Sequence, residues 1–250
     1  MKRFLPLALC VCWAMAADAN LISEFEPNPP GGDPADTTLE LFGTAGQAFN
    51  FNIYSIENDG INGTVDRASN VTGTFDALGL SVVTVPDLEN PSFTVLLTDG
   101  TVPLLATGTD LDSTDSGTLD VSALGTIFDA VAVSDAFADD ATLYAASLGG
   151  TNILYNGEFE PLGVFRSGSD GEWFQFVTAD FGQPTERLAV FAADGGPELS
   201  SDFFPAGDPT TTSFGAINPT AVPEPSSLAC LGMLGAGAVY RRVRRRSKVA

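Results

Sequence analysis

A segment near the middle of the chain concentrates oxygen ligands of the kind that calcium binds. Residues 110–117 read Asp-Leu-Asp-Ser-Thr-Asp-Ser-Gly. Calcium is held by several hard oxygen ligands, most of them carboxylate or carbonyl groups. The sequence therefore predicts a calcium site at Asp110, Asp112 and Asp115. An acidic surface loop is the alternative, because Val121 stands where an EF-hand loop counted from Asp110 would carry its last acidic ligand.

Several classes of catalytic site are excluded by composition. The chain has no histidine, which removes Ser-His-Asp and Cys-His sites and histidine-based zinc sites. Its three cysteines are Cys10, Cys12 and Cys230, so the part between the two ends has no thiol ligand or nucleophile. No Gly-Lys-Ser/Thr phosphate loop occurs. What remains for chemistry is carboxylates.

Carboxylate chemistry stays open but has no identifiable site. Residues 114–118 read Thr-Asp-Ser-Gly-Thr, like an aspartic-protease signature, but no second copy exists to share a proton with it. A glycosidase needs only two carboxylates, and the sequence does not single out a pair. We therefore predict no catalytic residue, with a secreted carboxylate-based hydrolase as an alternative.

An aromatic cluster raises the question of sugar binding. Trp173, Phe174 and Phe176 lie close together in the sequence, and an exposed aromatic face would stack on a sugar ring. Apolar residues at a spacing of two in a strand more often belong to a core. A calcium-dependent carbohydrate-binding module is accordingly a second alternative.

The elements that would position these residues are predicted to be β-strands. Alternating or β-branched apolar runs are bounded by Asp-Gly and Asn-Gly turn signals. The predicted strands are 39–42, 49–53, 80–85, 93–97, 127–133 and 173–177. One short helix is expected over 136–147, and the Thr- and Pro-rich segment 205–221 is expected to be a linker. Many short strands with such turns are typical of an all-β sandwich or barrel.

The charge is placed very unevenly along the chain. Residues 20–221 hold three of the 11 basic residues and 30 of the 32 acidic ones, a net charge of −27. Nucleic-acid binding rests on neutralising phosphates, so this region is not expected to bind nucleic acid. Such a charge favours solubility and attracts cations.

Both ends of the chain have the composition of targeting signals. Lys2 and Arg3 precede an apolar stretch and small residues near Ala16 and Ala19, as in a secretory signal peptide over 1–19. At the other end, 13 mostly apolar residues run from Leu228 to Tyr240, fewer than the roughly 20 of a full membrane span. We expect 20–204 to form the exported ectodomain.

Three features follow one another in the C-terminal region 222–250. Val222 precedes Pro-Glu-Pro, the apolar run follows, and a basic cluster closes the segment. In this order they resemble a PEP-CTERM sorting signal. The recognition residues are Pro223, Glu224 and Pro225, and the cytoplasmic basic residues are Arg241, Arg242, Arg244, Arg245 and Arg246. The resemblance implies processing by signal peptidase and an exosortase-like enzyme, a short transmembrane or sorting helix, and transient association with the inner membrane.

The ectodomain shows a second resemblance. Leu21-Ile22-Ser23-Glu24-Phe25, a Pro/Gly loop and Thr38-Leu39-Glu40-Leu41-Phe42 resemble the opening of a lamin-tail-like domain, and pieces up to about residue 135 continue it. Tyr54 and Ile56 stand where the family has a Trp. The resemblance implies an immunoglobulin-like β-sandwich.

These patterns converge on an exported protein of the cell surface, envelope or extracellular matrix. We expect a non-enzymatic structural, adhesive or polymer-associated role. Extracellular polysaccharide is an expected partner, no cofactor is required, and calcium is the candidate ion.

Overall fold

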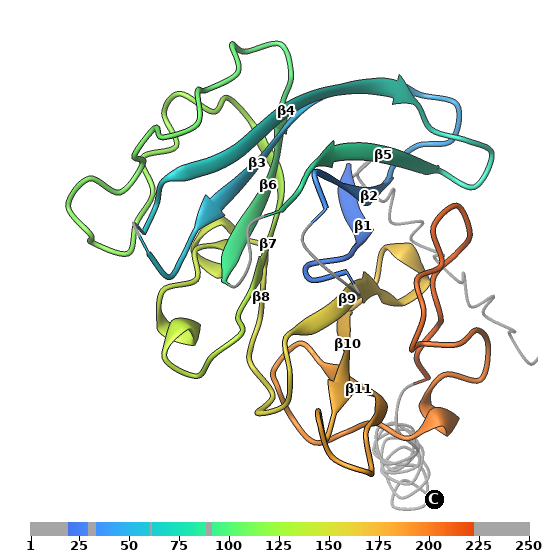
Figure 1. Cartoon of the computed structure of the whole chain (residues 1–250). Helices are drawn as coiled ribbons and strands as arrows, with labels where there is room; N and C mark the ends of the chain where they lie inside the picture. Colours follow the sequence, from blue (N-terminus) through green and yellow to red (C-terminus); the bar gives the residue numbers. More distant parts are fainter. Residues whose placement is uncertain (1–19, 30–33, 61, 89–91, 223–250) are drawn as a thin grey trace, which may run out of the picture.

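Two β-sheets packed face to face form the structure, a computed structural model that describes residues 20–29, 34–60, 62–88 and 92–222 (Figure 1). The first sheet has six strands, all paired antiparallel, in the order β11-β10-β9-β1-β2-β5. Its strands are β1 (Leu21–Phe25), β2 (Asp36–Phe42), β5 (Leu80–Pro86), β9 (Pro161–Arg166), β10 (Trp173–Ala179) and β11 (Arg187–Ala192).

The second sheet has five strands in the order β4-β3-β6-β7-β8. Its strands are β3 (Ala48–Glu57), β4 (Val65–Thr74), β6 (Phe93–Asp99), β7 (Ile127–Val133) and β8 (Thr151–Ile153). Strand β8 pairs parallel with β7, and the crossover between them contains the 3-10 helices η1 (Asp139–Ala141) and η2 (Ala145–Leu148). The prediction of an all-β sandwich-like fold is therefore confirmed at the level of two packed sheets.

The main core lies between the two sheets. Strands β1 and β2 contribute Ile22, Phe25, Leu39 and Leu41, and the facing sheet contributes side chains from β3, β6 and β7. Strand β6 is buried over six of its seven residues, because its other face also carries a cover. That second core packs Leu96 against the loop between β6 and β7 and against η2.

The outer face of the first sheet is covered by the end of the described chain. Phe165, Phe174 and Val190 pack there against Phe203 and Phe204. In Figure 1 this segment, coloured orange to red, runs beside the first sheet. Residues 205–221, which composition predicts to be a linker, continue along the same face and bond to it, and we call residues 205–222 the strap. The strap makes these hydrogen bonds with backbone amides and a serine hydroxyl, at Ser213 and Gly215. Amino-acid composition alone does not predict such backbone contacts.

An ion pair ties the two sheets together inside the molecule. Arg166 at the end of β9 donates to both carboxylate oxygens of Asp129 on β7, at 2.9 and 2.7 Å. The same guanidinium donates to the carbonyl of Ile22 and lies 4.8 Å from the centre of the Trp173 ring. Both charged side chains are nearly buried. Such a pair costs much desolvation, so removal of one partner is far more damaging than the pair is stabilising.

The six strands predicted from apolar runs all lie within observed strands. The single helix predicted over 136–147 is wrong, since two short 3-10 helices occupy that region. The physical reason is that side chains compete for the helical hydrogen bonds. Thr142 Oγ1 bonds to the carbonyl of Asn58, and the Tyr144 amide donates to Thr94 Oγ1 in place of a helical carbonyl.

Candidate functional site

The acidic loop predicted to bind calcium is built around Asp112. Its Oδ1 accepts hydrogen bonds from the amide and hydroxyl of Ser116, at 2.8 and 2.9 Å. Its Oδ2 accepts from the Gly117 amide at 2.7 Å and from the Tyr144 hydroxyl at 3.1 Å. Burial alone would raise the pKa of Asp112, but these hydrogen bonds dominate and lower it. The carboxylate is thus an ionised structural anchor of its own loop.

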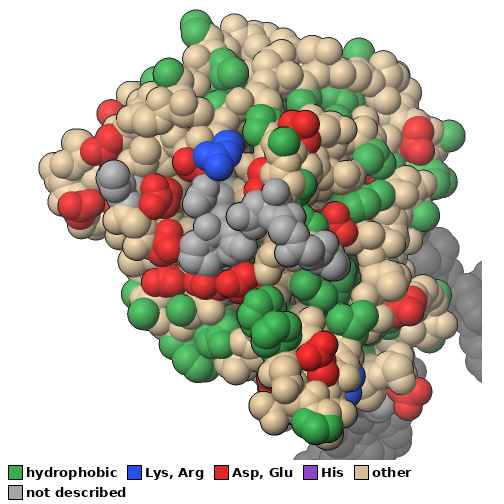
Figure 2. Space-filling view, viewed as in Figure 1, with side chains coloured by type: hydrophobic (Ala, Val, Ile, Leu, Met, Phe, Trp, Pro, Cys, Tyr) green, Lys and Arg blue, Asp and Glu red, His purple; other side chains and the backbone are tan. Residues whose placement is uncertain are grey.

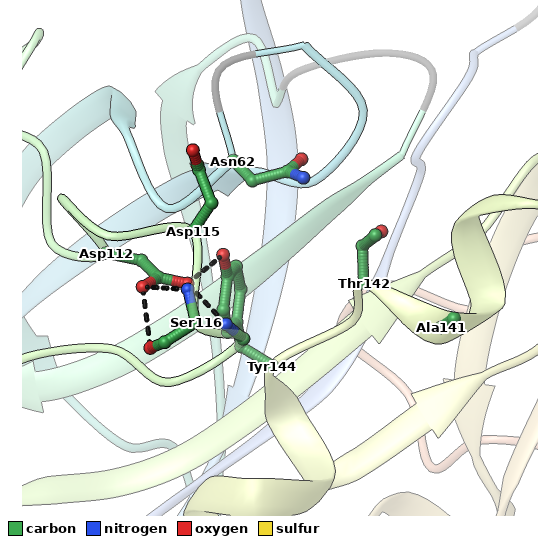
Figure 3. Close-up of a pocket in the computed structure, with 8 residues that line it drawn as sticks. Asn62, Asp112, Asp115, Ser116, Ala141, Thr142 and Tyr144 are labelled. Carbon is green, nitrogen blue, oxygen red and sulfur yellow. Dashed lines mark hydrogen bonds between the residues drawn. The ribbon is translucent and has the colours of Figure 1, made fainter.

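A pocket of about 260 Å³ opens beside this anchor (Figure 3). Asn62, Asp115, Thr142 and Tyr144 are among the residues that line it, with Asn62 and Asp115 on the side opposite Thr142. The loop before β4 approaches closely here because Gly63 has a φ of +81° and an added Cβ would lie 2.5 Å from Asp112. The side chains give the pocket a polar wall.

The three predicted calcium ligands are placed differently from one another. Asp110 Oδ1 accepts a hydrogen bond from the Asp112 amide, and Asp115 is exposed with a φ of 48°. Within the described ranges, no three Asp, Glu, His or Cys side chains are grouped so as to hold a metal ion. A calcium ion at Asp112 would have to replace hydrogen bonds that the loop already makes. Calcium binding stays a prediction that the geometry does not favour.

A second carboxylate arrangement, which the sequence did not single out, lies under the strap. Glu24 and Glu40 are directly opposite each other on β1 and β2, and both are fully buried. A bulge at Ser23 shifts the register, so Ile22 and Phe25 face the core while the residues between them face the strap. Like charges placed opposite each other are unfavourable, so this pair needs a physical explanation.

The strap supplies hydrogen-bond donors to both carboxyl groups. Glu24 receives the Ser213 amide at 2.8 Å and lies 3.0 Å from the Ser213 hydroxyl. Glu40 receives the Gly215 amide at 2.6 Å and also the Ser23 hydroxyl. The strap is further tied down by Asn218, whose side-chain amide donates to the carbonyl of Ser23 at 3.0 Å.

The Ser213 hydroxyl lies between two oxygen acceptors, Glu24 Oε2 and Asn218 Oδ1. The Ser213 hydroxyl has one hydrogen, and Asn218 Oδ1 lies 2.7 Å from it. Asn218 is oriented by its own bond to Ser23, so this oxygen is an acceptor. The hydroxyl therefore donates to either Glu24 Oε2 or Asn218 Oδ1 at one time. Burial raises the pKa of Glu24 to about 7, against the effect of the Ser213 bonds, and the charge of Glu40 adds to the rise.

Burial also raises the pKa of Glu40, against the bonds from Ser23 and Gly215 and with a further contribution from Asp76. Neither Glu24 nor Glu40 has an ion pair to a basic side chain within the ranges that the structure covers. The two carboxyl groups hold the strap through hydrogen bonds from Ser213 and Gly215. The arrangement does not present a carboxylate to a substrate, because both groups are inaccessible.

The aromatic cluster belongs to the interior. Trp173, Phe174 and Phe176 are 3%, 2% and 5% exposed. Trp173 packs edge-on against Phe25 at 6.1 Å, whereas Phe174 packs under Phe204 at 5.1 Å. Of the two interpretations that the sequence allowed, the structure supports the core.

The predicted sorting residues lie outside the described residues. These are Pro223, Glu224 and Pro225 and the five arginines from Arg241 to Arg246, and the predicted signal peptide 1–19 lies outside as well. In the part of the chain that the structure describes, no helix is long and apolar enough to cross a bilayer.

Comparison with known proteins assigns the C-terminal region. Residues 221–246 match the PEP-CTERM protein-sorting motif. Proteins that carry this motif are exported, processed by an exosortase and associated with the cell surface. No curated protein and no solved structure matches the chain.

Proposed function

We propose that the chain is a non-enzymatic protein of the bacterial surface or extracellular matrix, with a structural, adhesive or polymer-associated role. The observation that carries the proposal is the match of residues 221–246 to the sorting motif. The motif accounts for the export and sorting of the protein, and the acidic domain upstream is what arrives. The sequences of β1 and β2 resemble the opening of a lamin-tail-like domain. We propose that the acidic domain is of this type and serves in attachment.

The use of the carboxylates supports a non-enzymatic role. Glu24 and Glu40 lie directly opposite each other on neighbouring strands, and the strap covers both. Asp129 is held in an ion pair with Arg166, and Asp112 is held by four donors. A glycosidase needs two carboxyl groups that reach substrate. These residues instead stabilise the fold, so the hydrolase alternative has no site among them.

Removal of the sorting region tests the proposal. Cells that express the full chain are compared with cells that express a chain lacking Val222–Ala250, and the two proteins are followed by fractionation and by intact mass. We expect the full chain at the surface or in the matrix with a shortened C-terminus, and the deleted chain in the medium or misplaced. A second variant, Glu224→Ala, changes only the predicted recognition motif and keeps the apolar run and the arginines. It therefore separates loss of recognition from loss of the whole segment. Identical fractionation of all three proteins would refute the sorting role.

The calcium-dependent alternative has a separate test. Calcium at Asp110, Asp112 and Asp115 would raise the thermal midpoint of the protein by mass action. Because Asp112 is already satisfied by hydrogen bonds, we expect no change in the midpoint at millimolar calcium. A rise that is lost in Asp115→Asn would reinstate the carbohydrate-binding module as the favoured function.

A further inference from the structure

Two aromatic rings stand out from the surface of the domain. Phe137 and Phe181 are 69% and 58% exposed, the highest values among the large hydrophobic side chains of the described residues. Each ring is fixed by a second ring that is partly buried. Phe137 meets Tyr155 edge-on at 4.8 Å, and Phe181 stacks on Phe159 at 4.3 Å with an interplanar angle of 18°. Single exposed apolar residues are ordinary, but paired rings held in place form a preorganised surface.

Local contacts join the two ring pairs. Both partly buried rings belong to the connection between β8 and β9, residues 154–160. Phe137 lies across the middle of this connection, 3.5 Å from where a Cβ on Gly157 would be. The Asp180 amide donates to Glu158 Oε2 at 3.0 Å, which holds the turn that carries the other exposed ring against the same connection. We call the set the aromatic surface: Phe137, Tyr155, Phe159 and Phe181.

The surroundings of the aromatic surface are acidic. Burial, followed by the negative charges of Asp135, Glu158 and Glu160, raises the pKa of the Tyr155 hydroxyl. The basic side chain of Arg187 lies near Glu158 and Asp180. Both of its terminal nitrogens donate to the carboxylate of Glu198 at 2.6 Å, so its charge is already paired. The field at the rings is therefore negative. Figure 2 shows the same dominance of acidic over basic side chains across one face of the molecule.

Exposed rings next to carboxylates indicate which kind of ligand could bind. Ring faces attract cations and the C–H faces of sugars, and carboxylates at the rim pair with ammonium groups. An anionic polymer would be repelled by the acidic rim and by the net charge of −27 on residues 20–221. A polysaccharide of amino sugars with free amines offers both the C–H faces and the cations.

We propose that the aromatic surface binds an amino-sugar polysaccharide whose amines are not acetylated. The inference rests on the proposed function as a polymer-associated surface protein and names the class of polymer. Phe137 and Phe181 would each stack on the polymer, and the rim carboxylates Glu158, Glu160 and Asp180 would pair with its ammonium groups.

The test uses the purified full chain and glucosamine oligomers of defined length in calorimetric titrations. We expect binding that weakens with added salt, because ion pairs contribute. Phe137→Ala and Phe181→Ala should each weaken binding about tenfold, which is the loss expected for one desolvated cation–ring contact. Leu78→Ala, at a side chain that is 52% exposed in the turn before β5, is the matched control and should bind like the unchanged protein. Thermal midpoints of all variants should agree, because the rings are exposed.

The acetylated oligomer, the control variant and a basic polypeptide separate the possible outcomes. The fully N-acetylated oligomer should bind at least about tenfold more weakly than the free amine. Equal affinity for both oligomers, or an equal loss in Leu78→Ala, would overturn the inference. Polylysine that binds with the same dependence on the two rings and displaces the oligomer would assign the surface to a basic polypeptide instead, and would also overturn it. No binding of the oligomer, with sorting still dependent on residues 222–250, would remove this inference and leave the proposed function standing.

Discussion

Replacing Glu24 with Gln should stabilise the protein at alkaline pH and leave it unchanged in acid. Glu24 is fully buried, and its pKa is about 7 in the folded state against an ordinary value of 4.5. A carboxyl group with a raised pKa binds its proton more tightly when folded. Its contribution is therefore fully present below about pH 4.5 and is lost as the pH rises through 7. The difference between the two pKa values corresponds to about 3 kcal/mol.

The measurement is the free energy of unfolding in urea at pH 5 and pH 8. Glutamine keeps the shape of the protonated carboxyl group and can still accept the Ser213 amide and donate to its hydroxyl. We expect Glu24→Gln to exceed the unchanged protein by less than about 1 kcal/mol at pH 5, where the loss has only begun, and by up to about 3 kcal/mol at pH 8. Glu172→Gln, at an exposed side chain, is the matched control and should show no such difference.

Other groups titrate in the same range, and the design accounts for them. Burial raises the pKa of Asp135 to about 6, with Asp139 adding to the rise, so the unchanged protein loses stability from more than one carboxyl group. The comparison between variant and unchanged protein at each pH isolates Glu24. If the two proteins differ by the same amount at pH 5 and at pH 8, Glu24 is ionised in the folded state and the reasoning fails.

Three further predictions concern the elements that hold the sheets, the strap and the acidic loop. Asp129→Asn should cost about 3–5 kcal/mol in urea unfolding, because it leaves the Arg166 charge buried without its partner, whereas Glu198→Gln in the exposed pair with Arg187 should cost less than about 1 kcal/mol. A chain that lacks 223–250 should keep its thermal midpoint. A chain that lacks 205–250 should lose several degrees, because removal of the strap exposes Glu24 and Glu40. Equal midpoints of the two shortened chains would mean that the strap does not stabilise the domain. Tyr144→Phe should cost about 1.5–3 kcal/mol through loss of one hydrogen bond to a charged group, and an unchanged free energy of unfolding would remove that anchor from the loop.

The strands could be predicted because their signal is local. Phe49 to Ile53 alternates with a period of two, and Phe93 to Leu97 is a bulky apolar run, so pattern and burial agree. Strand β4 has a polar sequence and was not predicted, because it forms by pairing with β3 along its length. Its apolar residues Val65 and Val71 are too few to give a pattern on their own.

The buried carboxyl pair could not be predicted for the opposite reason. Glu24 is bonded to a residue 189 positions away, and no pattern near Glu24 encodes that contact. A glutamate in a strand is ordinarily read as an exposed residue. The acidic loop shows the converse case: Asp110, Asp112 and Asp115 have the composition of an ion site, but Asp112 is used by donors within its own loop and by Tyr144. Composition reports ligands and does not report which of them are already satisfied.

The strap changes how the sorting motif is connected to the domain. The Ala221 amide donates to the Ser167 hydroxyl at 2.8 Å, and the Val222 amide donates to the carbonyl of Phe203 at 3.0 Å. The matched motif begins at residue 221, so fixed backbone and motif meet without a spacer.

A cut at or beyond Pro223 would therefore leave every described bond of the strap inside the mature domain, including those to Glu24 and Glu40. The stability of that domain should then be the same before and after processing. The processing enzyme reaches its recognition residues by one of two routes. Either the strap detaches from the sheet first, or the enzyme binds while the strap is still attached. The pH dependence predicted for Glu24 distinguishes these two routes, because only release of the strap would respond to ionisation of the carboxyl group beneath it.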